Sequence, residues 1–306
     1  MKESNILLKE LSNQKLILFG ASSRGIRVLN NLIWKGFNKN LILFCDNNPK
    51  KHGKKIFGVN IINIDDLKQL SLDIHIIISS SMSNEIQIQL KNLGFTNVYY
   101  FHDLLFSDHR FEKYNSEFLQ IVENVKDKCY LDDEEKYTLY SSLKSTSHLD
   151  GDLAEVGVYK GGSAKILCEL KNSKKLYLFD TFEGLPETSK NDTVKSGWLS
   201  DTSLESVKKY LSDYENVSFY QGYFPKTTST LTTENFSLVH LDTDLYQSTL
   251  DALDFFWPRM ISGGRIISHD YNAIDVGGVK QAFDEFFKDS PEKIIEIADT
   301  QVMIIK

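Results

Sequence analysis

The stretch from Phe236 to Asp270 constrains the fold more than any other part of the chain. Two short, mostly apolar segments, 236–242 and 265–270, flank a segment of helical character at 246–257, and Pro258 and a Gly-Gly pair separate this helix from the second apolar segment. Short apolar runs of this kind are typical of parallel strands that are covered on both faces. The sequence therefore predicts a strand–helix–strand unit of a parallel α/β sheet.

Each of these two predicted strands ends on a carboxylate. Asp242 ends the first strand, Asp270 ends the second, and Asp244 follows two residues after Asp242. The carboxyl ends of parallel strands share one edge of the sheet, and ligands bind there in open α/β sheets. Three acids at one edge repel one another, so the pattern favours a bound cation or a role in proton transfer.

Length and charge distribution indicate two domains. A chain of 306 residues exceeds the usual size of one domain, and its 41% hydrophobic content is sufficient for buried cores. Basic residues outnumber acidic ones over residues 1–106, whereas acids prevail in the remainder and give the chain a net charge of −7. The first part is only mildly basic and its one dense run, 50–55, is interpreted as a solvated turn, so we expect no nucleic-acid partner.

Cysteine usage and the N-terminal sequence favour the cytoplasm. The three cysteines, Cys45, Cys129 and Cys168, lie far apart, which fits a reducing compartment. Residues 1–4 do not begin a signal peptide, and no apolar run approaches the ~20 residues that span a bilayer. We therefore expect a cytoplasmic protein without a membrane span.

Residues 1–106 alternate between predicted strands and helices, which indicates a small parallel α/β domain. The turn from Gly20 to Gly25 after the first strand would let a phosphate approach a helix N-terminus, and Asp46, at the end of the second strand, is placed for ribose hydroxyls. A tight turn without a ligand explains the same glycines, because their spacing differs from G-x-G-x-x-G. The predicted strands are 15–20, 41–46, 74–80 and 98–101.

This first domain resembles the small Rossmann-like domain that lies beside the catalytic unit in some sugar acetyltransferases and sugar C-methyltransferases. Gly20, Arg24 and Asp46 are the matching positions. The resemblance implies binding of a nucleotide or a nucleotide sugar.

Residues 107–149 are predicted to be a helical connector that also covers the next domain. The expected helices are 111–125 and 132–143. The acidic cluster 132–135 is interpreted as a helix N-terminus, where the helix dipole favours negative charge.

The second predicted domain, residues 150–306, opens with a strand and a glycine-rich turn. Gly161 and Gly162 let the backbone pass close to a ligand, and the helix that follows offers free N–H groups. The next strand ends on Asp180, which is placed to accept hydrogen bonds from a ribose diol or else caps the turn structurally. Two closely connected strands, 293–298 and 301–306, end the chain.

Residues from about 130 to 306 resemble the macrocin O-methyltransferase family, S-adenosylmethionine-dependent enzymes that methylate sugar hydroxyls. Several sequence blocks carry the resemblance, and they follow one another in the family's order. These blocks are 155–159 with 161–162, 179–186, 222–224, 240–249, 263–265 and 270–271.

The resemblance implies a class I methyltransferase fold with a seven-stranded sheet and a closing antiparallel hairpin. It also implies a divalent ion, magnesium or manganese, on Asp242 and on two consecutive acids that here are His269 and Asp270, so one ligand has changed type. The implied cofactor-binding residues are Glu155, Gly157, Tyr159, Gly161, Gly162, Ser163, Asp180, Thr181, Phe182, Gly222 and Asp242.

Methylation of an alcohol requires removal of the hydroxyl proton and in-line orientation toward the sulfonium methyl. Asp242 and Asp270 suit a metal, and Asp244 suits the general base. Three roles stay open for His269. The first is a metal ligand, which would shift the metal preference away from magnesium. The second is the general base, and the third is a side chain that packs on the opposite face of its strand.

We therefore expect an S-adenosylmethionine-dependent O-methyltransferase that acts on a small sugar or nucleotide sugar, in surface-glycan or nucleotide-sugar metabolism. A homo-oligomer is compatible with the sequence. One alternative is an NAD-dependent sugar oxidoreductase or epimerase that uses Gly20 to Asp46, and the missing third glycine argues against it. Another alternative is a non-catalytic nucleotide-sugar-binding protein. The one observation that suggests it is His269 in place of a metal-binding acid.

Overall fold

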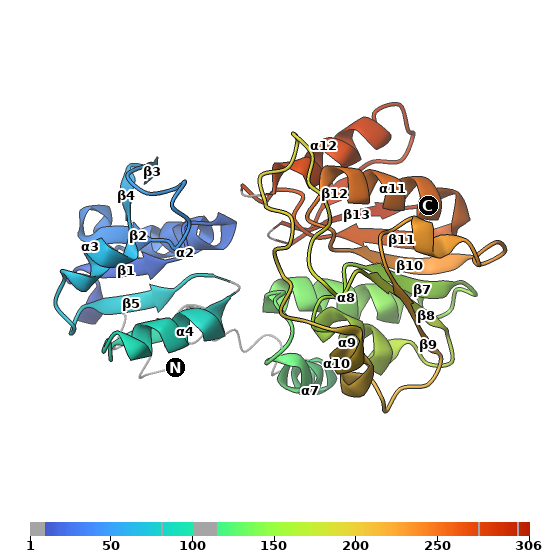
Figure 1. Cartoon of the computed structure of the whole chain (residues 1–306), viewed down its shortest axis with the longest axis horizontal. Helices are drawn as coiled ribbons and strands as arrows, with labels where there is room; N and C mark the ends of the chain where they lie inside the picture. The colour runs from blue at the N-terminus through green and yellow to red at the C-terminus, as the bar shows by residue number, and fades with distance from the viewer. Residues whose placement is uncertain (1–9, 81, 101–114, 275, 299) are drawn as a thin grey trace. The chain divides into compact units, whose positions relative to one another are not determined.

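The computed structural model describes residues 10–80, 82–100, 115–274, 276–298 and 300–306. The chain divides into two compact units, Met1–Lys113 and Tyr114–Lys306 (Figure 1). Each unit has its own sheet and its own hydrophobic core.

The first unit contains a six-stranded sheet with the order β3-β4-β2-β1-β5-β6. All neighbouring strands are parallel except β3, which pairs with β4 in a hairpin. The strands are β1 (Leu16–Phe19), β2 (Ile42–Cys45), β3 (Lys55–Ile56), β4 (Val59–Ile62), β5 (His75–Ile78) and β6 (Val98–Tyr100). The helical segments are α2 (Ser23–Trp34), η1 (Lys39–Leu41), α3 (Ile64–Lys68) and α4 (Ser83–Asn92).

The hairpin β3–β4 was not predicted. Its first strand has two residues, and the turn at Phe57 and Gly58 has positive φ at both positions, 48° and 82°. A strand of this length shows no recognisable alternation, so a sequence pattern does not reveal it.

The second unit contains a seven-stranded sheet with the order β12-β13-β11-β10-β7-β8-β9. The strands β11, β10, β7, β8 and β9 are parallel to one another, whereas β13 is antiparallel to both β11 and β12. The predicted sheet with a closing antiparallel hairpin is therefore confirmed. The strands are β7 (Asp152–Val156), β8 (Leu176–Asp180), β9 (Val217–Gln221), β10 (Phe236–Leu241), β11 (Met260–Ser268), β12 (Ile295–Glu296) and β13 (Val302–Ile305).

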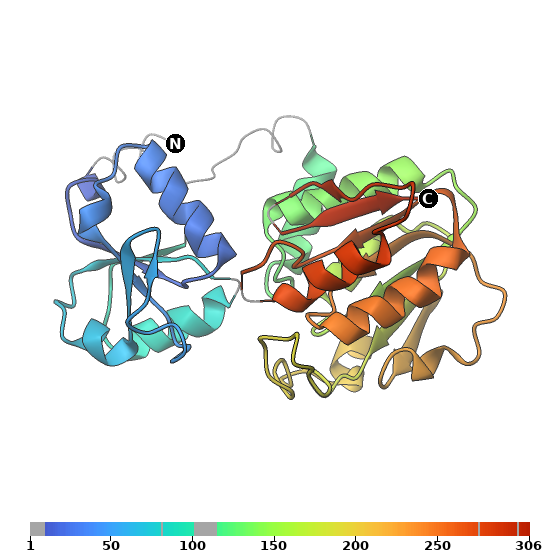
Figure 2. The same ribbon diagram turned by 90° about the horizontal axis from the view of Figure 1, so that it is seen from above.

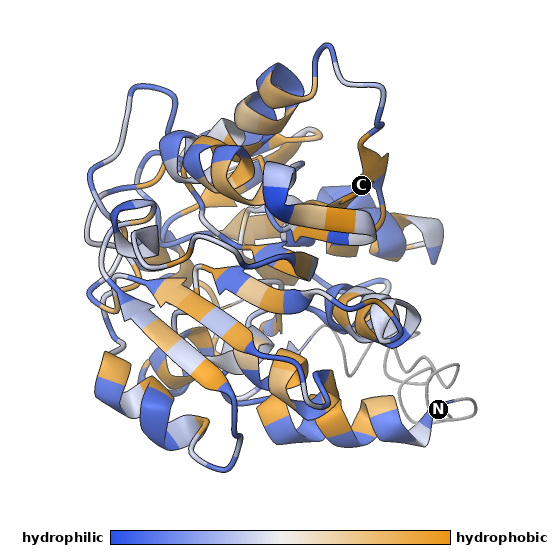
Figure 3. Ribbon diagram, turned by 90° about the vertical axis from the view of Figure 1, so that its right-hand side faces the viewer, coloured by the Kyte–Doolittle hydropathy of each residue, from blue (hydrophilic) through white to orange (hydrophobic). Residues whose placement is uncertain are grey.

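Helices cover both faces of this sheet. Figures 1 and 2 show α11 and α12 on one face and α7, α8 and α9 on the other, and the hydropathy colouring of Figure 3 shows apolar strands between helices with one apolar and one polar side. The helices are α7 (Ser116–Val125), α8 (Asp133–Thr146), α9 (Gly162–Leu170), α10 (Leu204–Tyr210), α11 (Tyr246–Phe256) and α12 (Gly277–Phe286), with short 3₁₀ turns η2 (Lys226–Thr228) and η3 (Trp257–Arg259).

The predicted connector supplies α7 and α8, which belong to the second unit. Residues 111–114 of the expected first helix lie outside the described residues. In the described part of the chain, no helix combines the length and the apolar character needed to cross a membrane.

Candidate active site

The carboxyl ends of the parallel strands in the second sheet form one edge, and the predicted site residues gather along it. The chain order of the strands reverses between β7 and β10, and open α/β sheets bind ligands at such a point. The backbones approach closely there, because a Cβ atom on Gly157 would lie 1.9 Å from the carbonyl oxygen of Asp242. Glycine at position 157 therefore lets Asp242 lie directly against the turn after β7.

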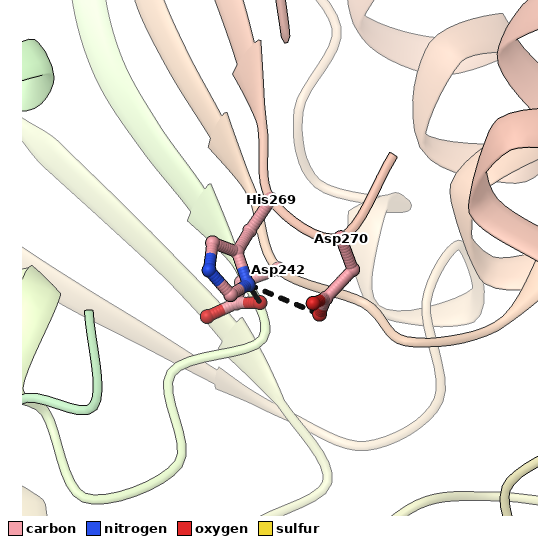
Figure 4. A group of neighbouring side chains, drawn as sticks. All are labelled: Asp242, His269 and Asp270. Carbon is pink, nitrogen blue, oxygen red and sulfur yellow. Dashed lines mark ion pairs between the residues drawn. The ribbon is translucent and has the colours of Figure 1, made fainter. Parts of the chain in front are cut away.

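The three predicted metal ligands meet at this edge. Asp242 follows β10, and His269 and Asp270 follow the neighbouring strand β11. His269 Nδ1 lies 3.2 Å from Asp242 Oδ1 and 3.0 Å from Asp270 Oδ2 (Figure 4). One potential ligand atom from each residue falls within a cluster in which all atoms are within 4.8 Å of one another.

The interpretation that His269 packs on the opposite face is wrong. Strand β11 ends at Ser268, and Asp270 has a left-handed φ of 64°. The alternation of side chains along a strand therefore stops before His269, and both side chains turn toward Asp242.

A fourth residue, Glu135 of helix α8, contacts this cluster. Its Oε1 lies 3.0 Å from His269 Nε2, and its side chain is only 1% exposed. The sequence placed Glu135 in an acidic helix N-terminus, and that interpretation is also correct, because Asp132 and Glu135 form a capping box. Nothing in the sequence pattern relates Glu135 to a histidine 134 residues away.

Opposing electrostatic effects act within the cluster. Burial would lower the pKa of His269, but Asp270, Glu135 and Asp242 together raise it well above its ordinary value. Burial would raise the pKa of Asp242, but the neighbouring His269 more than offsets this and lowers it. The three carboxylates around His269 therefore favour a positively charged group at this position.

Asp244 lies beside the cluster, in the turn between β10 and α11. Its φ is 58° and it is 9% exposed. Burial, together with repulsion from Asp270 and Asp242, raises the pKa of Asp244 well above the ordinary value. A carboxylate with a raised pKa accepts protons more readily, as the predicted general base must.

The turn after β7 has a left-handed backbone at three positions. Gly157, Tyr159 and Gly161 have positive φ values of 89°, 49° and 83°. Helix α9 begins at Gly162, and its N-terminus has no side-chain cap. Glycine at position 162 makes room for the protein's own backbone, because a Cβ atom there would lie 2.3 Å from the Cα atom of Cys129, so the approach of a ligand to this glycine stays a prediction.

Glu155 lies at the end of β7 and is fully buried. Its Oε1 lies 2.8 Å from Nδ1 of His240, which is its register partner in the neighbouring strand β10. Burial raises the pKa of Glu155 although His240 acts in the opposite direction. Glu155 Oε2 and His240 Nε2 have no hydrogen-bond partner in the described part of the chain, and a polar ligand or a water molecule would satisfy such atoms.

Asp180, the predicted ribose acceptor, accepts backbone hydrogen bonds. Its Oδ2 accepts from the N–H groups of Val158 at 2.7 Å and Tyr159 at 2.8 Å, and its Oδ1 accepts from the N–H of Phe182 at 2.6 Å. A carboxylate accepts about four hydrogen bonds, so most of this capacity holds the turns after β7 and β8 together. The geometry favours the structural role that the sequence left open, and the ribose contact stays a prediction.

Three more of the predicted cofactor-binding residues, Thr181, Phe182 and Gly222, lie next to Asp180 at the ends of β8 and β9. The N–H of Gly222 donates to the carbonyl oxygen of Asp180 at 2.9 Å, and Thr181 Oγ1 donates to the carbonyl oxygen of Gly184 at 2.6 Å. Phe182 is 2% exposed. The hydrogen bond of Gly222 holds the ends of β8 and β9 together, and contact of these residues with the cofactor stays a prediction.

The connection between β8 and α10, residues 181–203, forms a strap along the same edge. Asp201 accepts a hydrogen bond from Tyr159 Oη at 2.5 Å and forms an ion pair with Lys160 at 2.6 Å. Asp192 Oδ1 accepts from the first N–H of α11 at 2.7 Å. The strap therefore joins the turn after β7 to α11. No sequence motif predicted these contacts.

In the first unit, Gly20 follows β1, Arg24 lies in the first turn of α2, and Asp46 follows the neighbouring strand β2. A Cβ atom on Gly25 would lie 2.0 Å from the carbonyl oxygen of Gly20. Asp46 Oδ2 accepts from the N–H of Ala21 at 2.8 Å and pairs with Lys51 at 3.3 Å.

Two conclusions follow for this turn. The basic run 50–55 is only partly a solvated turn, because Lys51 also donates to the carbonyl oxygen of Ala21 at 2.9 Å. The carboxylate of Asp46 is already engaged, which favours the tight-turn interpretation over a ribose contact.

The strand order, the glycine-rich turn after β7 and the acids after β10 and β11 define a class I methyltransferase fold in the second unit. The chain belongs to the macrocin O-methyltransferase family, whose model matches residues 142–304. A second family model, described as C2185-like, N-terminal, matches residues 12–98.

The curated relatives of this chain are O-methyltransferases by name. A tetracenomycin-C 4'-O-methyltransferase of Streptomyces olivaceus, whose substrate carries a dimethoxyrhamnosyl group, is 34% identical over an alignment of 143 residues, and the match covers 41% of this chain and 54% of that protein. The mycinamicin III 3''-O-methyltransferase of Micromonospora griseorubida is 27% identical over 140 residues, 40% of this chain and 55% of that protein. The chain thus spans about half the length of the curated relatives it matches.

The solved structure of the O-methyltransferase NovP is similar in fold. It has a TM-score of 0.52 and 23% identity, and the similarity covers 58% of this chain and 81% of that chain. This likeness supports the fold assignment.

Proposed function

We propose that this protein is an S-adenosylmethionine-dependent O-methyltransferase whose acceptor is a sugar hydroxyl, on a small glycoside or a nucleotide sugar. We place it in the cytoplasm, in surface-glycan or nucleotide-sugar metabolism. Family membership and the sugar-directed relatives support the reaction class. The observation that carries the proposal is the cluster of Asp242, His269 and Asp270, with Asp244 beside it, at the sheet edge that also bears the glycine-rich turn.

The residues after β7 fit the cofactor. The uncapped N-terminus of α9 offers N–H groups to a carboxylate, and the buried Glu155 Oε2 needs a polar partner. The predicted cofactor set remains Glu155, Gly157, Tyr159, Gly161, Gly162, Ser163, Asp180, Thr181, Phe182, Gly222 and Asp242. Asp180 would contribute mainly by holding the turn.

The cluster after β10 and β11 fits a divalent cation. His269 Nδ1 is buried between the carboxylates of Asp242 and Asp270, and it is not aligned for a hydrogen bond to either of them. One imidazole nitrogen with two carboxylate oxygens is a donor set for manganese, iron, cobalt or zinc more than for magnesium. Asp242, His269 and Asp270 would hold the ion.

Bound S-adenosylmethionine would supply an electrophilic methyl group, and the cation would lower the pKa of the acceptor hydroxyl. The chain's own residues would position the acceptor and remove its proton. A carboxylate oxygen of Asp244 would accept this proton, because Asp244 lies beside the cluster and its burial raises the proton affinity of its carboxylate. His269 as the alternative base is less favoured, since both of its ring nitrogens face carboxylates.

Purified protein incubated with S-adenosylmethionine and a panel of free, nucleotide-linked and glycosidic sugars tests the proposal. Mass spectrometry should detect S-adenosylhomocysteine and a product that is one methylene heavier. Asp244→Asn should lower kcat by roughly 10²- to 10⁴-fold, the usual contribution of a general base, while Glu187→Gln, an exposed change in the strap, should act like wild type.

Wild-type turnover by folded Asp244→Asn would remove Asp244 as the base. The absence of both cofactor binding by calorimetry and methyl transfer to every acceptor would overturn the proposed function. Binding of NAD in place of S-adenosylmethionine would favour the oxidoreductase alternative.

A further inference from the structure

The two ring nitrogens of His269 face different partners. Nδ1 points toward Asp242 Oδ1 and Asp270 Oδ2, whereas Nε2 lies 3.0 Å from Glu135 Oε1. An ionised carboxylate only accepts hydrogen bonds, so Glu135 requires a proton on Nε2. A neutral imidazole with its proton on Nε2 presents the Nδ1 lone pair to the site between Asp242 and Asp270.

Glu135 is held firmly in this position. Its Oε2 accepts from the N–H of Asp132 at 2.8 Å, and its Oε1 accepts from Thr300 Oγ1 at 3.3 Å. The same Thr300 hydroxyl accepts from the N–H of Asp270 at 3.3 Å. Glu135 therefore connects the first turn of α8, the segment before β13 and the turn after β11 in one buried network.

We propose that Glu135 is a positioning residue for the metal site, which fixes the tautomer and the orientation of His269 so that Nδ1 binds a divalent cation together with Asp242 and Asp270. This inference rests on the cation of the proposed function. A carboxylate hydrogen-bonded to the distal nitrogen of a metal-binding histidine is a recurrent arrangement that raises the basicity of the ligand. Glu135 lies before the segment 142–304 matched by the family, so the family's motif does not assign it this role.

Visible absorption of bound Co²⁺ tests this role without measuring turnover. Full-length wild type, Glu135→Gln and the control Glu134→Gln are titrated with Co²⁺ after treatment with a chelator. Glu134 is the exposed neighbour on the same helical turn. Glu135→Gln should bind Co²⁺ about 10- to 100-fold more weakly, with a changed spectrum, and Glu134→Gln should match wild type.

A double-variant cycle separates positioning from a general effect on the fold. In the His269→Asp background, Glu135→Gln should cause no further loss of Co²⁺ affinity, because the ring that Glu135 orients is gone. Wild-type Co²⁺ affinity and spectrum in folded Glu135→Gln, or an equal loss with and without His269, would overturn the inference. If Glu135→Gln does not fold, Glu135→Asp keeps the charge but shortens the reach to His269, and wild-type affinity in that variant would overturn the inference equally.

Failure of this inference differs from failure of the proposed function. A wild-type chain that transfers methyl groups in chelator and shows no Co²⁺ spectrum overturns the role of Glu135 and leaves the reaction standing. A chain with the expected Co²⁺ results but without methyl transfer supports the role of Glu135 and overturns the reaction.

Discussion

Asp180 accepts three backbone hydrogen bonds, and its loss would leave the N–H groups of Val158, Tyr159 and Phe182 without their acceptor. We expect Asp180→Ala to weaken S-adenosylmethionine binding by roughly 1.5 to 3 kcal/mol, the range for hydrogen bonds to a charged group. The turn after β7 would relax, so the free energy of unfolding should fall as well. Calorimetry and urea denaturation measure the two effects.

The comparison of both quantities identifies the role of Asp180. A loss of affinity at unchanged stability would favour direct contact with the ribose. Unchanged affinity in a folded variant would remove Asp180 from the cofactor site and leave the structural role, which the free energy of unfolding tests.

The cluster of Asp242, His269 and Asp270 predicts a metal requirement. Turnover should vanish in a chelator and return with added manganese or cobalt, while S-adenosylmethionine binding largely survives. His269→Asp should restore activity with magnesium if His269 is a ligand, because magnesium prefers oxygen donors. If His269 is the general base, the same change should depress turnover with every metal, and full activity in chelator would end the metal hypothesis.

At the scale of elements, the strap 181–203 is fixed to the turn after β7 by Asp201. The Asp201 side chain is 61% exposed, whereas that of its partner Lys160 is 17% exposed. Burial would lower the pKa of Lys160, but Asp201, Tyr159 and Tyr130 together raise it. The contact therefore persists as an ion pair across the neutral pH range.

Asp201→Asn should raise KM for S-adenosylmethionine up to about fivefold, because an exposed ion pair contributes about 0.2–1 kcal/mol. The melting temperature should stay within the error of wild type. Glu187→Gln, an exposed change in the same strap, is the matched control for initial-rate measurements. Equal KM values for both variants would mean that the strap does not act on the cofactor site.

At the scale of the whole molecule, the first unit carries the expectation of nucleotide-sugar binding. Asp46 is engaged by Ala21 and Lys51, and Arg24 is the predicted contact of this turn that carries a positive charge. If the turn binds a nucleotide sugar, Arg24→Gln in the full-length chain should weaken binding by roughly 1.5 to 3 kcal/mol, since an Arg–phosphate hydrogen bond is charge-assisted. Affinity for S-adenosylmethionine should not change.

Calorimetry with a panel of nucleotide sugars measures this effect. The same affinity in Arg24→Gln would exclude the turn as the binding site. Absence of binding to any member of the panel would indicate a structural or assembly role for the first unit.

The sequence determined the α/β class, the strand ends that carry Asp242 and Asp270, and the closing hairpin, because hydrophobic runs and turn residues act locally. It also placed Asp244 and His269 next to these strand ends. The sequence did not reveal the hairpin β3–β4, because its first strand, Lys55–Ile56, begins within the basic run 50–55 that was interpreted as a solvated turn.

Only the tertiary structure decided how these residues are connected. The contact of Glu135 with His269, the backbone hydrogen bonds of Asp180 and the strap contact of Asp201 join residues 134, 22 and 42 positions apart. Such contacts depend on how α8, the turns and the strap pack along one edge of the sheet. A local pattern fixes where an acid stands along the chain, whereas packing fixes whether its carboxylate meets a histidine, a backbone N–H or solvent.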